Sequence, residues 1–305
     1  MNETEYKDFC ILVADSEERV FSLLTELFCC RGIHVIRAIS GPQALTMIEQ
    51  NNPALVVADI HLPGINGFEL LGTVRQRFPK IRCMLMTNYE VDQYISLVIE
   101  HNIGNILIKD EDFCLNEIST YIMSLIKGDI FGLQRYFPHT DIHKALVTSY
   151  GGCKNLYSQI IQSASVANPL YLEIAIDELV SNAVFHGVLQ FTGVPRELWA
   201  EDFCFTTGEA ISLSWASDDE KVGISVEDPR GNLKKTDVLY WLNQHRVSKD
   251  ISSQEHGRGF LLIRKVIDRL IINIDPGKRT ECIVFQYLDK RTIGHKKPLL
   301  VHELA

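Results

Sequence analysis

The feature that most constrains this fold is a fivefold alternation of short apolar runs and amphipathic stretches between residues 10 and 127. The apolar runs are CILVAD, HVIRA, PALVVAD, RCMLMT and GNILIK, and an amphipathic stretch follows each of them. Runs of this length are typical of buried strands, and their alternation with helices indicates βα units. The pattern therefore predicts an α/β fold with a doubly wound, five-stranded parallel sheet covered by helices on both faces.

Polar side chains end four of these predicted strands, at Asp15, Asp59, Thr87 and Lys109. The functional groups of a parallel sheet gather at the carboxyl ends of its strands, so these four are expected to converge. The two carboxylates can hold a hard cation, while the hydroxyl and the ammonium can bind the oxygens of a phosphoryl group on Asp59. The set indicates an acyl-phosphate site. The alternative is that polar residues end strands in any fold.

The same segments resemble the receiver domain of response regulators. ILVAD, VVADIHLPGINGFELL, LMT and ILIK match its pattern in order and spacing, over nearly all of residues 1–127. The resemblance implies a flavodoxin-like fold and a two-component phosphorelay, in which an upstream histidine kinase or phosphotransfer protein phosphorylates Asp59. It also implies roles for the surrounding groups: Mg²⁺ held by Asp15, Asp59 and the backbone of His61, a switch hydroxyl on Thr87, and a phosphoryl-binding ammonium on Lys109.

Three positions depart from the receiver pattern. Ser16 stands where a second acid usually follows the first strand, which predicts weaker metal binding. Ile106 replaces the aromatic switch residue, so the usual ring rotation is unavailable, and Asp110 replaces the proline that usually follows the lysine. We expect a receiver that accepts phosphate, while the route by which the signal leaves it stays open.

The length of 305 residues suggests a second domain, at a prior of about 150 residues per domain. KGDIFGLQRYFPHTD mixes Gly, Pro and polar residues and predicts a linker at 128–140. The second domain is then expected at 141–292, and a tail at 293–305.

One predicted helix of this domain, residues 169–187, carries a polar stripe. Glu178, Asn182 and His186 recur at four-residue steps, which would stack a carboxylate, an amide and an imidazole on one helix face. The helix is expected to begin after the cap residue Asn168, with Pro169 at its first position, and to end at Gly187. Its buried side is predicted to hold Leu172, Ala175, Ile176, Leu179 and Ala183. The stripe indicates a nucleotide site; a surface helix whose polar face meets water is the alternative.

Three downstream features add to this stripe. ISLSWA and KVGISVED read as an antiparallel hairpin whose core-facing row ends in Asp228, and a buried acid needs a donor partner. Gly257 and Gly259 precede an amphipathic helix, whose N-terminus favours phosphate. LIINIDPGKRTECIVFQYL reads as a closing hairpin with Thr280 at the start of its return strand. Each feature alone is weak evidence.

Together these features resemble the GHKL ATPase fold and, within it, the anti-sigma-factor serine kinases. The resemblance implies an α/β sandwich with a mixed or antiparallel sheet that binds ATP and Mg²⁺. It implies a kinase acting on an anti-anti-sigma protein, or an output domain that binds a sigma factor. The implied roles are a general base at Glu178, Mg²⁺ binding by Asn182, adenine recognition by Asp228, phosphate binding at Gly257 and Gly259, and Thr280 near the base. For His186, helix-end packing is favoured over chemistry.

The acid-containing loop departs from the family pattern D-x-G-x-G. It reads Asp228-Pro229-Arg230-Gly231-Asn232, so neither expected glycine position holds glycine. Arg230 could clash with a ligand or point away from it. The sequence therefore leaves two functions open: an ATP-dependent protein kinase, or a non-catalytic partner-switching module with a degenerate pocket. VLQFTGVPRELWAEDFCFTTGEA, which contains Trp199, is a candidate partner surface or a flap on the core.

A histidine kinase is a further alternative, but it would need a phosphoacceptor histidine on a long helical hairpin. His139 and His143 instead lie in a proline-containing connection, which disfavours that class.

Composition narrows the remaining classes. A net charge of −9 without clustered Lys and Arg argues against direct nucleic-acid binding. The sequence has no apolar run of membrane-spanning length and its N-terminus is unlike a secretory signal, so we expect a cytoplasmic protein with no membrane contact. The eight scattered cysteines are typical of a reducing compartment. A homodimer is possible, because both resembled families often dimerise.

Overall fold

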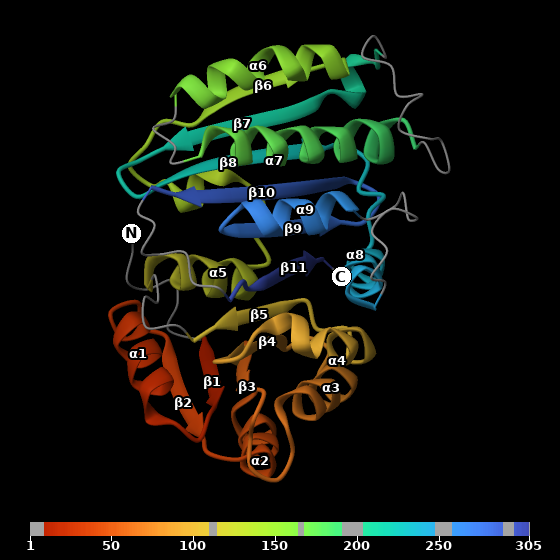
Figure 1. The fold of residues 1–305 in the computed structure, drawn as a ribbon. Coiled ribbons are helices and arrows are strands. Elements are labelled where there is room, and N and C mark those ends of the chain that lie inside the picture. Colours follow the sequence, from red (N-terminus) through yellow and green to blue (C-terminus); the bar gives the residue numbers. More distant parts are fainter. Residues whose placement is uncertain are drawn as a thin grey trace. The chain divides into compact units, whose positions relative to one another are not determined.

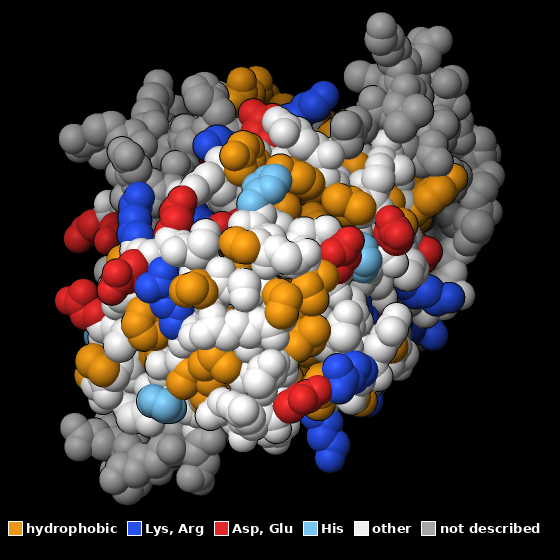
Figure 2. All heavy atoms as spheres, turned by 90° about the horizontal axis from the view of Figure 1, so that it is seen from below, with side chains coloured by type: hydrophobic (Ala, Val, Ile, Leu, Met, Phe, Trp, Pro, Cys, Tyr) orange, Lys and Arg blue, Asp and Glu red, His pale blue; other side chains and the backbone are white. Residues whose placement is uncertain are grey.

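The computed structural model describes residues 9–109, 115–163, 168–190, 204–247, 258–288 and 296–304. The chain divides into two compact units, Met1–Ile130 and Phe131–Ala305, whose elements are labelled in Figure 1. None of the helices in these described ranges is long and apolar enough to cross a membrane. On the face drawn in Figure 2, acidic and basic side chains lie interspersed with small hydrophobic areas.

The first unit is built on a five-stranded parallel sheet of order β2-β1-β3-β4-β5. Its strands are β1 (Cys10–Ala14), β2 (His34–Ala38), β3 (Leu55–Asp59), β4 (Arg82–Thr87) and β5 (Asn105–Ile108). Its helices are α1 (Glu18–Cys29), α2 (Gly41–Asn51), α3 (Gly67–Arg77), α4 (Ile95–Glu100) and α5 (Leu115–Lys127), with the 3-10 turn η1 (Val91–Tyr94) before α4. The predicted α/β fold with five parallel strands is confirmed.

The local sequence explains where these elements begin and what they bury. Ser40 caps α2 through its side chain, and Asn66 caps α3 by accepting a hydrogen bond from the N–H of Glu69 at 3.0 Å. The central strands are covered on both sides, so Leu12 and Val56 are fully buried. Helix α1 lies beside α5, and α2 beside α3.

The second unit has a mixed sheet of order β11-β9-β10-β8-β7-β6. The strands are β6 (His143–Val147), β7 (Ile211–Ser217), β8 (Lys221–Asp228), β9 (Arg269–Asp275), β10 (Arg279–Tyr287) and β11 (Leu299–Glu303). All neighbours pair antiparallel except β11 and β9, which are parallel. The described helices are α6 (Tyr150–Ser163), α7 (Pro169–Ser181), α8 (Lys235–Val247) and α9 (Arg258–Val266), with short turns η2 (Leu133–Tyr136), η3 (Asn182–Val188) and η5 (Thr207–Glu209).

Helices α6, α7 and α9 lie side by side on one face of this sheet (Figure 1). The predicted hairpins are present as β7 with β8 and β9 with β10. The second unit therefore has the expected mixed sheet, with these three helices packed on one of its faces.

The polar-stripe helix differs from the prediction in its last turns. It begins as expected, with Pro169 at its first position and Asn168 accepting a hydrogen bond from the N–H of Tyr171 at 3.3 Å. All five residues predicted for its buried side are buried. After Ser181, however, the chain continues to Val188 as a π-helix instead of ending at Gly187. The wider π-helical turns break the four-residue spacing assumed for His186.

The expected tail also differs, because it contains a strand. Leu299, Leu300 and Val301 are almost fully buried, and β11 pairs with β9 from Leu300 to Glu303. The ammonium of Lys297, which lies within this tail, is 2.8 Å from the carbonyl oxygen of Ile267, just after α9. A cation at a helix C-terminus neutralises unpaired carbonyl groups, so this lysine fixes the strand to the helix.

Candidate functional site

Two strand-end carboxylates of the first unit, Asp15 and Asp59, meet around the buried ammonium of Lys109. Nζ of Lys109 lies 2.7 Å from Oδ2 of Asp15 and 2.5 Å from Oδ2 of Asp59. Asp15 is 1 % exposed and Lys109 is 9 % exposed. Burial alone would lower the pKa of Lys109, but its hydrogen bonds to the two carboxylates outweigh burial, and the pKa is raised. The predicted convergence of Asp15, Asp59 and Lys109 is thus present in the structure.

Backbone groups hold both carboxylates. The N–H of His61 donates to Oδ1 of Asp59 at 3.1 Å, and the N–H of Glu17 donates to Oδ1 of Asp15 at 2.9 Å. Gly67 begins α3 directly beside Asp59, and a Cβ on this glycine would lie 2.2 Å from the Asp59 carbonyl oxygen. Only glycine therefore allows this approach of the helix to the strand end.

Thr87 lies at the end of β4 and is fully buried. Its Oγ1 accepts a hydrogen bond from the N–H of Tyr89 at 3.1 Å. Next to the site, Nε2 of His61 lies 2.9 Å from the hydroxyl of Tyr94, and the Tyr89 ring meets the His61 ring edge-on at 4.9 Å. Sequence reasoning missed these two tyrosines.

Tyr94 is held in this group by more than one contact. Desolvation, with Tyr89 and Asp59 nearby, raises the pKa of its hydroxyl. The position of the family's aromatic switch is instead filled by Ile106, which is fully buried in β5. Tyr89 and Tyr94, which follow Thr87 in the sequence, thus place aromatic rings beside the site.

The strand-end residues provide two carboxylates for a cation, but not the second acid that usually follows the first strand. Asp15 and Asp59 face one point, since one ammonium bridges them, and hard cations prefer such carboxylate oxygens. The missing second acid is replaced by Ser16, whose carbonyl oxygen accepts from Arg37 at 2.8 Å. Among the residues with described placement, no cluster of three or more acidic, His or Cys side chains is arranged to hold a metal. Mg²⁺ binding by Asp15, Asp59 and the His61 backbone stays a prediction.

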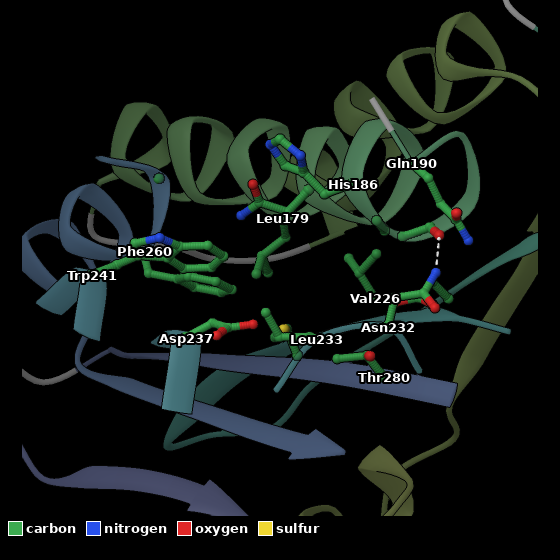
Figure 3. Close-up of a pocket in the computed structure, with 16 residues that line it drawn as sticks. Leu179, His186, Gln190, Val226, Asn232, Leu233, Asp237, Trp241, Phe260 and Thr280 are labelled. Carbon is green, nitrogen blue, oxygen red and sulfur yellow. Dashed lines mark hydrogen bonds between the residues drawn. The ribbon is translucent and has the colours of Figure 1, made fainter. Parts of the chain in front are cut away.

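The second unit contains a pocket of about 480 Å³ between the helices and the sheet (Figure 3). In Figure 3, Trp241 and Phe260 lie at one end of the pocket and Gln190 and Asn232 at the other. The lining residues come from α7, η3, β8, α8, α9 and β10: Leu179, Asn182, Ala183, His186, Gly187, Gln190, Val226, Asp228, Asn232, Leu233, Asp237, Trp241, Gly259, Phe260, Thr280 and Cys282. Four predicted ligand residues, Asn182, Asp228, Gly259 and Thr280, therefore share one cavity.

Asp228 lies on the sheet side of this pocket. It is 5 % exposed and stands opposite Thr280 in the pairing of β8 with β10. Burial raises the pKa of Asp228, and the backbone N–H groups of Arg230 and Gly231, which donate to Oδ1 at 2.9 and 3.2 Å, oppose this shift. A Cβ on Gly187 would lie 3.0 Å from Oδ2, so a glycine is needed where η3 passes the carboxylate.

The N-terminus of α9 lies against the polar stripe. A Cβ on Gly259 would lie 2.8 Å from Oε2 of Glu178 and 3.2 Å from Nδ2 of Asn182. That Nδ2 atom is buried and has no hydrogen-bond partner within the described ranges. The glycine therefore brings the first turn of α9 close to this amide, and a helix N-terminus beside an amide that lacks a described partner is the setting expected for a bound anion and its cation.

Two residues of the stripe lie at the border of the pocket. His186 was expected to serve helix-end packing, but its side chain is exposed and borders the pocket. Glu178 contacts Gly259 closely but is outside the pocket lining, so it lies beside the cavity rather than in it. The π-helical turns explain the shift of His186, because they rotate the residues after Ser181.

In the altered loop after Asp228, Asn232 lines the cavity but Arg230 does not. The guanidinium of Arg230 pairs with Glu209, and Arg230 is not among the pocket-lining residues. Gly231 has φ +61° and packs on the following hairpin, where a Cβ would lie 2.3 Å from the Asp275 carbonyl oxygen. Asn232 donates from Nδ2 to the carbonyl oxygen of Gly187 at 3.0 Å, the dashed line in Figure 3. The clash considered for Arg230 does not occur in this conformation.

Some predicted residues fall outside the described residues, namely Gly257, Asp110 and Trp199. The pocket residues that sequence reasoning missed are mainly Asp237, Trp241 and Phe260. Trp241 and Asp237 share α8, whose weak amphipathic pattern offered no signal, while Phe260 follows directly after the GRG segment.

Comparison with known proteins matches the first unit. A family model for the response regulator receiver domain matches residues 11–119. Sporulation initiation phosphotransferase F of Bacillus subtilis (strain 168) is 34 % identical over 79 residues, which cover 26 % of this chain and 64 % of that protein. Transcriptional regulatory protein HptR of Staphylococcus aureus (strain NCTC 8325 / PS 47) is 26 % identical over 113 residues, covering 36 % of this chain and 44 % of that protein.

The chain thus spans less than two thirds of either relative's length. Among solved structures, the signal receiver domain of an HD domain-containing protein from Pseudomonas fluorescens Pf-5 is 25 % identical, with a TM-score of 0.38 over 41 % of this chain and 91 % of that one. The family match, together with Asp15, Asp59, Thr87 and Lys109 at the strand ends, leads to one conclusion: the N-terminal unit of this chain is a receiver domain of the two-component response regulators.

Proposed function

We propose that phosphorylation of Asp59 controls a C-terminal output unit that binds ATP and acts as a serine/threonine kinase of the anti-sigma-factor type. The upstream partner is a histidine kinase or a phosphotransfer protein, the partner class with which receiver domains work. The downstream partner is an anti-anti-sigma protein, or a sigma factor bound directly. The observation that carries the proposal is the meeting of Asn182, Asp228, Gly259 and Thr280 in one cavity.

The cavity offers matching chemistry for each part of a nucleotide. Asp228, with Thr280 opposite it, supplies a buried acceptor for an exocyclic amino group. The apolar side chains of Leu179, Val226 and Phe260 supply a surface for a planar base. The Asn182 amide and the backbone at Gly259 would hold Mg²⁺ and the phosphates, in agreement with the buried Nδ2 atom that lacks a partner in the described ranges.

When bound, Mg²⁺ neutralises charge that develops on the transferred phosphoryl group, and catalysis is otherwise positioning. Glu178 lies beside Gly259, at the rim of the site, where a carboxylate can orient a substrate hydroxyl and accept its proton. This closeness to Gly259 supports the proposed role of Glu178 as general base.

Titration of ATP-Mg²⁺ into the full chain, followed by calorimetry, tests the nucleotide site. We expect saturable binding, weakened at least tenfold in Asn182→Ala, which corresponds to about 1.4 kcal/mol. Asn51→Ala is the matched control, since Asn51 is an exposed amide at the end of α2 in the first unit. If the wild-type chain does not bind at millimolar ATP, the kinase assignment is wrong.

A non-catalytic partner-switching module is the second candidate. It is favoured by the Asp228 loop, in which Oδ1 already accepts two backbone hydrogen bonds, and by the described lining, which has the acidic side chains of Asp228 and Asp237 but no lysine or arginine. A kinase assay with [γ-³²P]ATP and a Ser-containing anti-anti-sigma protein separates the candidates, because only the kinase gives label that disappears in Glu178→Gln.

The receiver function has its own test. Incubation with a phosphorylated histidine kinase or phosphotransfer protein is expected to label the wild-type chain and not Asp59→Ala. Asp92→Ala, which changes an acid in η1 away from the strand ends, serves as the control. Equal labelling of Asp59→Ala and the wild-type chain would contradict Asp59 as the phosphoacceptor.

A further inference from the structure

The second unit buries a carboxylate that the nucleotide site does not use. Glu281 on β10 is 3 % exposed. Ser225 on β8 donates to its Oε1 at 2.7 Å, and Asn273 on β9 donates to its Oε2 at 3.1 Å. A buried charge is tolerated only where donors surround it, and these two come from the strands on either side.

A third donor comes from the joint, the segment 131–137 with which the second unit begins. The backbone N–H of Gly132 lies 2.9 Å from Oε2 and 3.1 Å from Oε1 of Glu281. Gly132 is the second residue of the C-terminal unit, five residues after the end of α5 at Lys127. Its φ of +97° favours glycine, and no heavy atom would lie within 4 Å of an added Cβ. The Glu281 carboxylate therefore holds the joint through the backbone N–H of Gly132 and not through a side chain of that residue.

Neighbouring side chains hold the joint on the same strands. The guanidinium carbon of Arg279 on β10 lies 3.8 Å from the ring centre of Phe131. Phe137 packs on β8 so closely that a Cβ on Gly223 would lie 2.4 Å from its Cε2. Tyr136 meets Phe285 of β10 edge-on, with ring centres 5.0 Å apart. The segment 131–137 is thus built onto β8 and β10.

The pocket lies on the other face of those two strands. Thr280 precedes Glu281 in β10, and successive side chains of a strand point to opposite faces. Thr280, Asp228 and Val226 line the pocket, while Glu281 and Ser225 face the joint. A movement that pulls Gly132 away from Glu281 therefore acts on the strand residue next to Thr280.

We propose that Glu281 couples the joint at Gly132 to the pocket, so that phosphorylation of the receiver changes ligand binding through this contact. The coupling rests on the proposed function for its ligand, but the contact and its effect on β8 and β10 can be measured without a ligand. Loss of the joint contact leaves the buried carboxylate short of a donor, and the two strands must adjust to satisfy it.

Hydrogen exchange of the full chain tests the contact directly. The wild-type chain, treated with acetyl phosphate and Mg²⁺, is expected to change its exchange at the amides of β8 and β10 relative to the untreated chain. Glu281→Gln and Gly132→Ala are expected to abolish this difference. In Glu281→Gln, an amide NH₂ group replaces one carboxylate oxygen and faces N–H donors. In Gly132→Ala, the added methyl group meets no heavy atom within 4 Å, so it disturbs the joint only through the backbone strain at a φ of +97°.

Two control variants separate the coupling from general damage. Ser225→Ala removes one donor from Glu281 but leaves the Gly132 contact. Gly277→Ala introduces a side chain at a φ of +73°, likewise with open space, outside the joint. Both are expected to keep the wild-type response. A response that persists in Glu281→Gln and Gly132→Ala, or its absence from the wild-type chain, would overturn the coupling.

ATP titration of the same proteins distinguishes the two proposals. We expect the dissociation constant of the wild-type chain to change about fivefold or more on phosphorylation, a typical allosteric coupling, and not to change in Glu281→Gln. If no protein binds ATP while the exchange response follows the expected pattern, the proposed nucleotide function fails and the coupling stands. If ATP binds and Glu281→Gln responds like the wild-type chain, the coupling fails alone.

Discussion

Replacing Asp228 by asparagine should separate the stability of the pocket from its ligand binding. Asp228 is 5 % exposed, and burial raises its pKa, so the ionised carboxylate is disfavoured in the folded unit. Asparagine keeps the shape and the Oδ1 acceptor for the N–H groups of Arg230 and Gly231. It removes the buried charge. Strained or desolvated functional groups of this kind typically lower stability by about 0.5–2 kcal/mol.

We therefore expect Asp228→Asn to raise the free energy of unfolding at pH 7 by about that amount, measured by urea denaturation. The sign follows from linkage. A carboxyl group with a raised folded pKa opposes folding once the pH exceeds its unfolded pKa of about 3.9, and this cost is largest above its folded pKa. The gain should therefore vanish below that range, where Asp228 is protonated in both states.

ATP binding should move in the opposite direction. An amide in place of the carboxylate presents a donor to the adenine amino group, and a lost or reversed charge-assisted hydrogen bond costs about 1.5–3 kcal/mol, or roughly 10- to 150-fold in affinity. Calorimetric titration of the same preparations measures this loss. An Asp228→Asn protein that is less stable than the wild type at pH 7, or one that binds ATP equally well, refutes the reasoning.

Three further predictions concern other parts of the chain. His302 is buried, and its pKa is lowered to about 3 by desolvation and by Lys235 and Arg135, so the unfolding free energy should fall by about 1.4 kcal/mol per pH unit as pH drops from 6.5 towards 3. His302→Gln should remove that slope in pH-dependent denaturation. Lys109→Met leaves two carboxylates without their cation and should destabilise the receiver by about 3–5 kcal/mol in urea unfolding; a loss under 1 kcal/mol would contradict the buried pair. Gly259→Ala should weaken ATP binding by about 1–3 kcal/mol through overpacking, whereas Gly208→Ala, which has open space, should not; equal affinities would place the ligand elsewhere.

The fold and the site of the receiver could be predicted from the sequence, because both depend on short local segments: the apolar runs and the polar residues that end them. Each apolar run specifies a buried strand, and the sheet rule then brings Asp15, Asp59 and Lys109 together without knowledge of the loops. Tyr89 and Tyr94 were not anticipated, because their approach to His61 depends on the path of the segment between β4 and α4.

The second unit shows where local patterns fail. The π-helical turns at Asn182–Val188 have no sequence code of their own and arise where Gly187 passes Asp228. The strand β11 was not predicted, because it pairs with β9 and not with β10, the strand that precedes it in the sequence. Likewise, the loop has its glycine at Gly231, one position after the glycine that the family pattern expects at position 230. Gly231 packs against the Asp275 carbonyl oxygen, a contact that is made only in the folded unit.

The central claim is that the state of Asp59 controls a nucleotide pocket in the second unit. The most direct measurement is the affinity of the full chain for ATP-Mg²⁺ with and without phosphorylation, with Asp59→Ala measured under both conditions. We predict saturable binding that changes about fivefold or more in the wild-type chain and stays constant in Asp59→Ala. Binding that is absent at millimolar ATP, or identical in the two phosphorylation states, contradicts the claim.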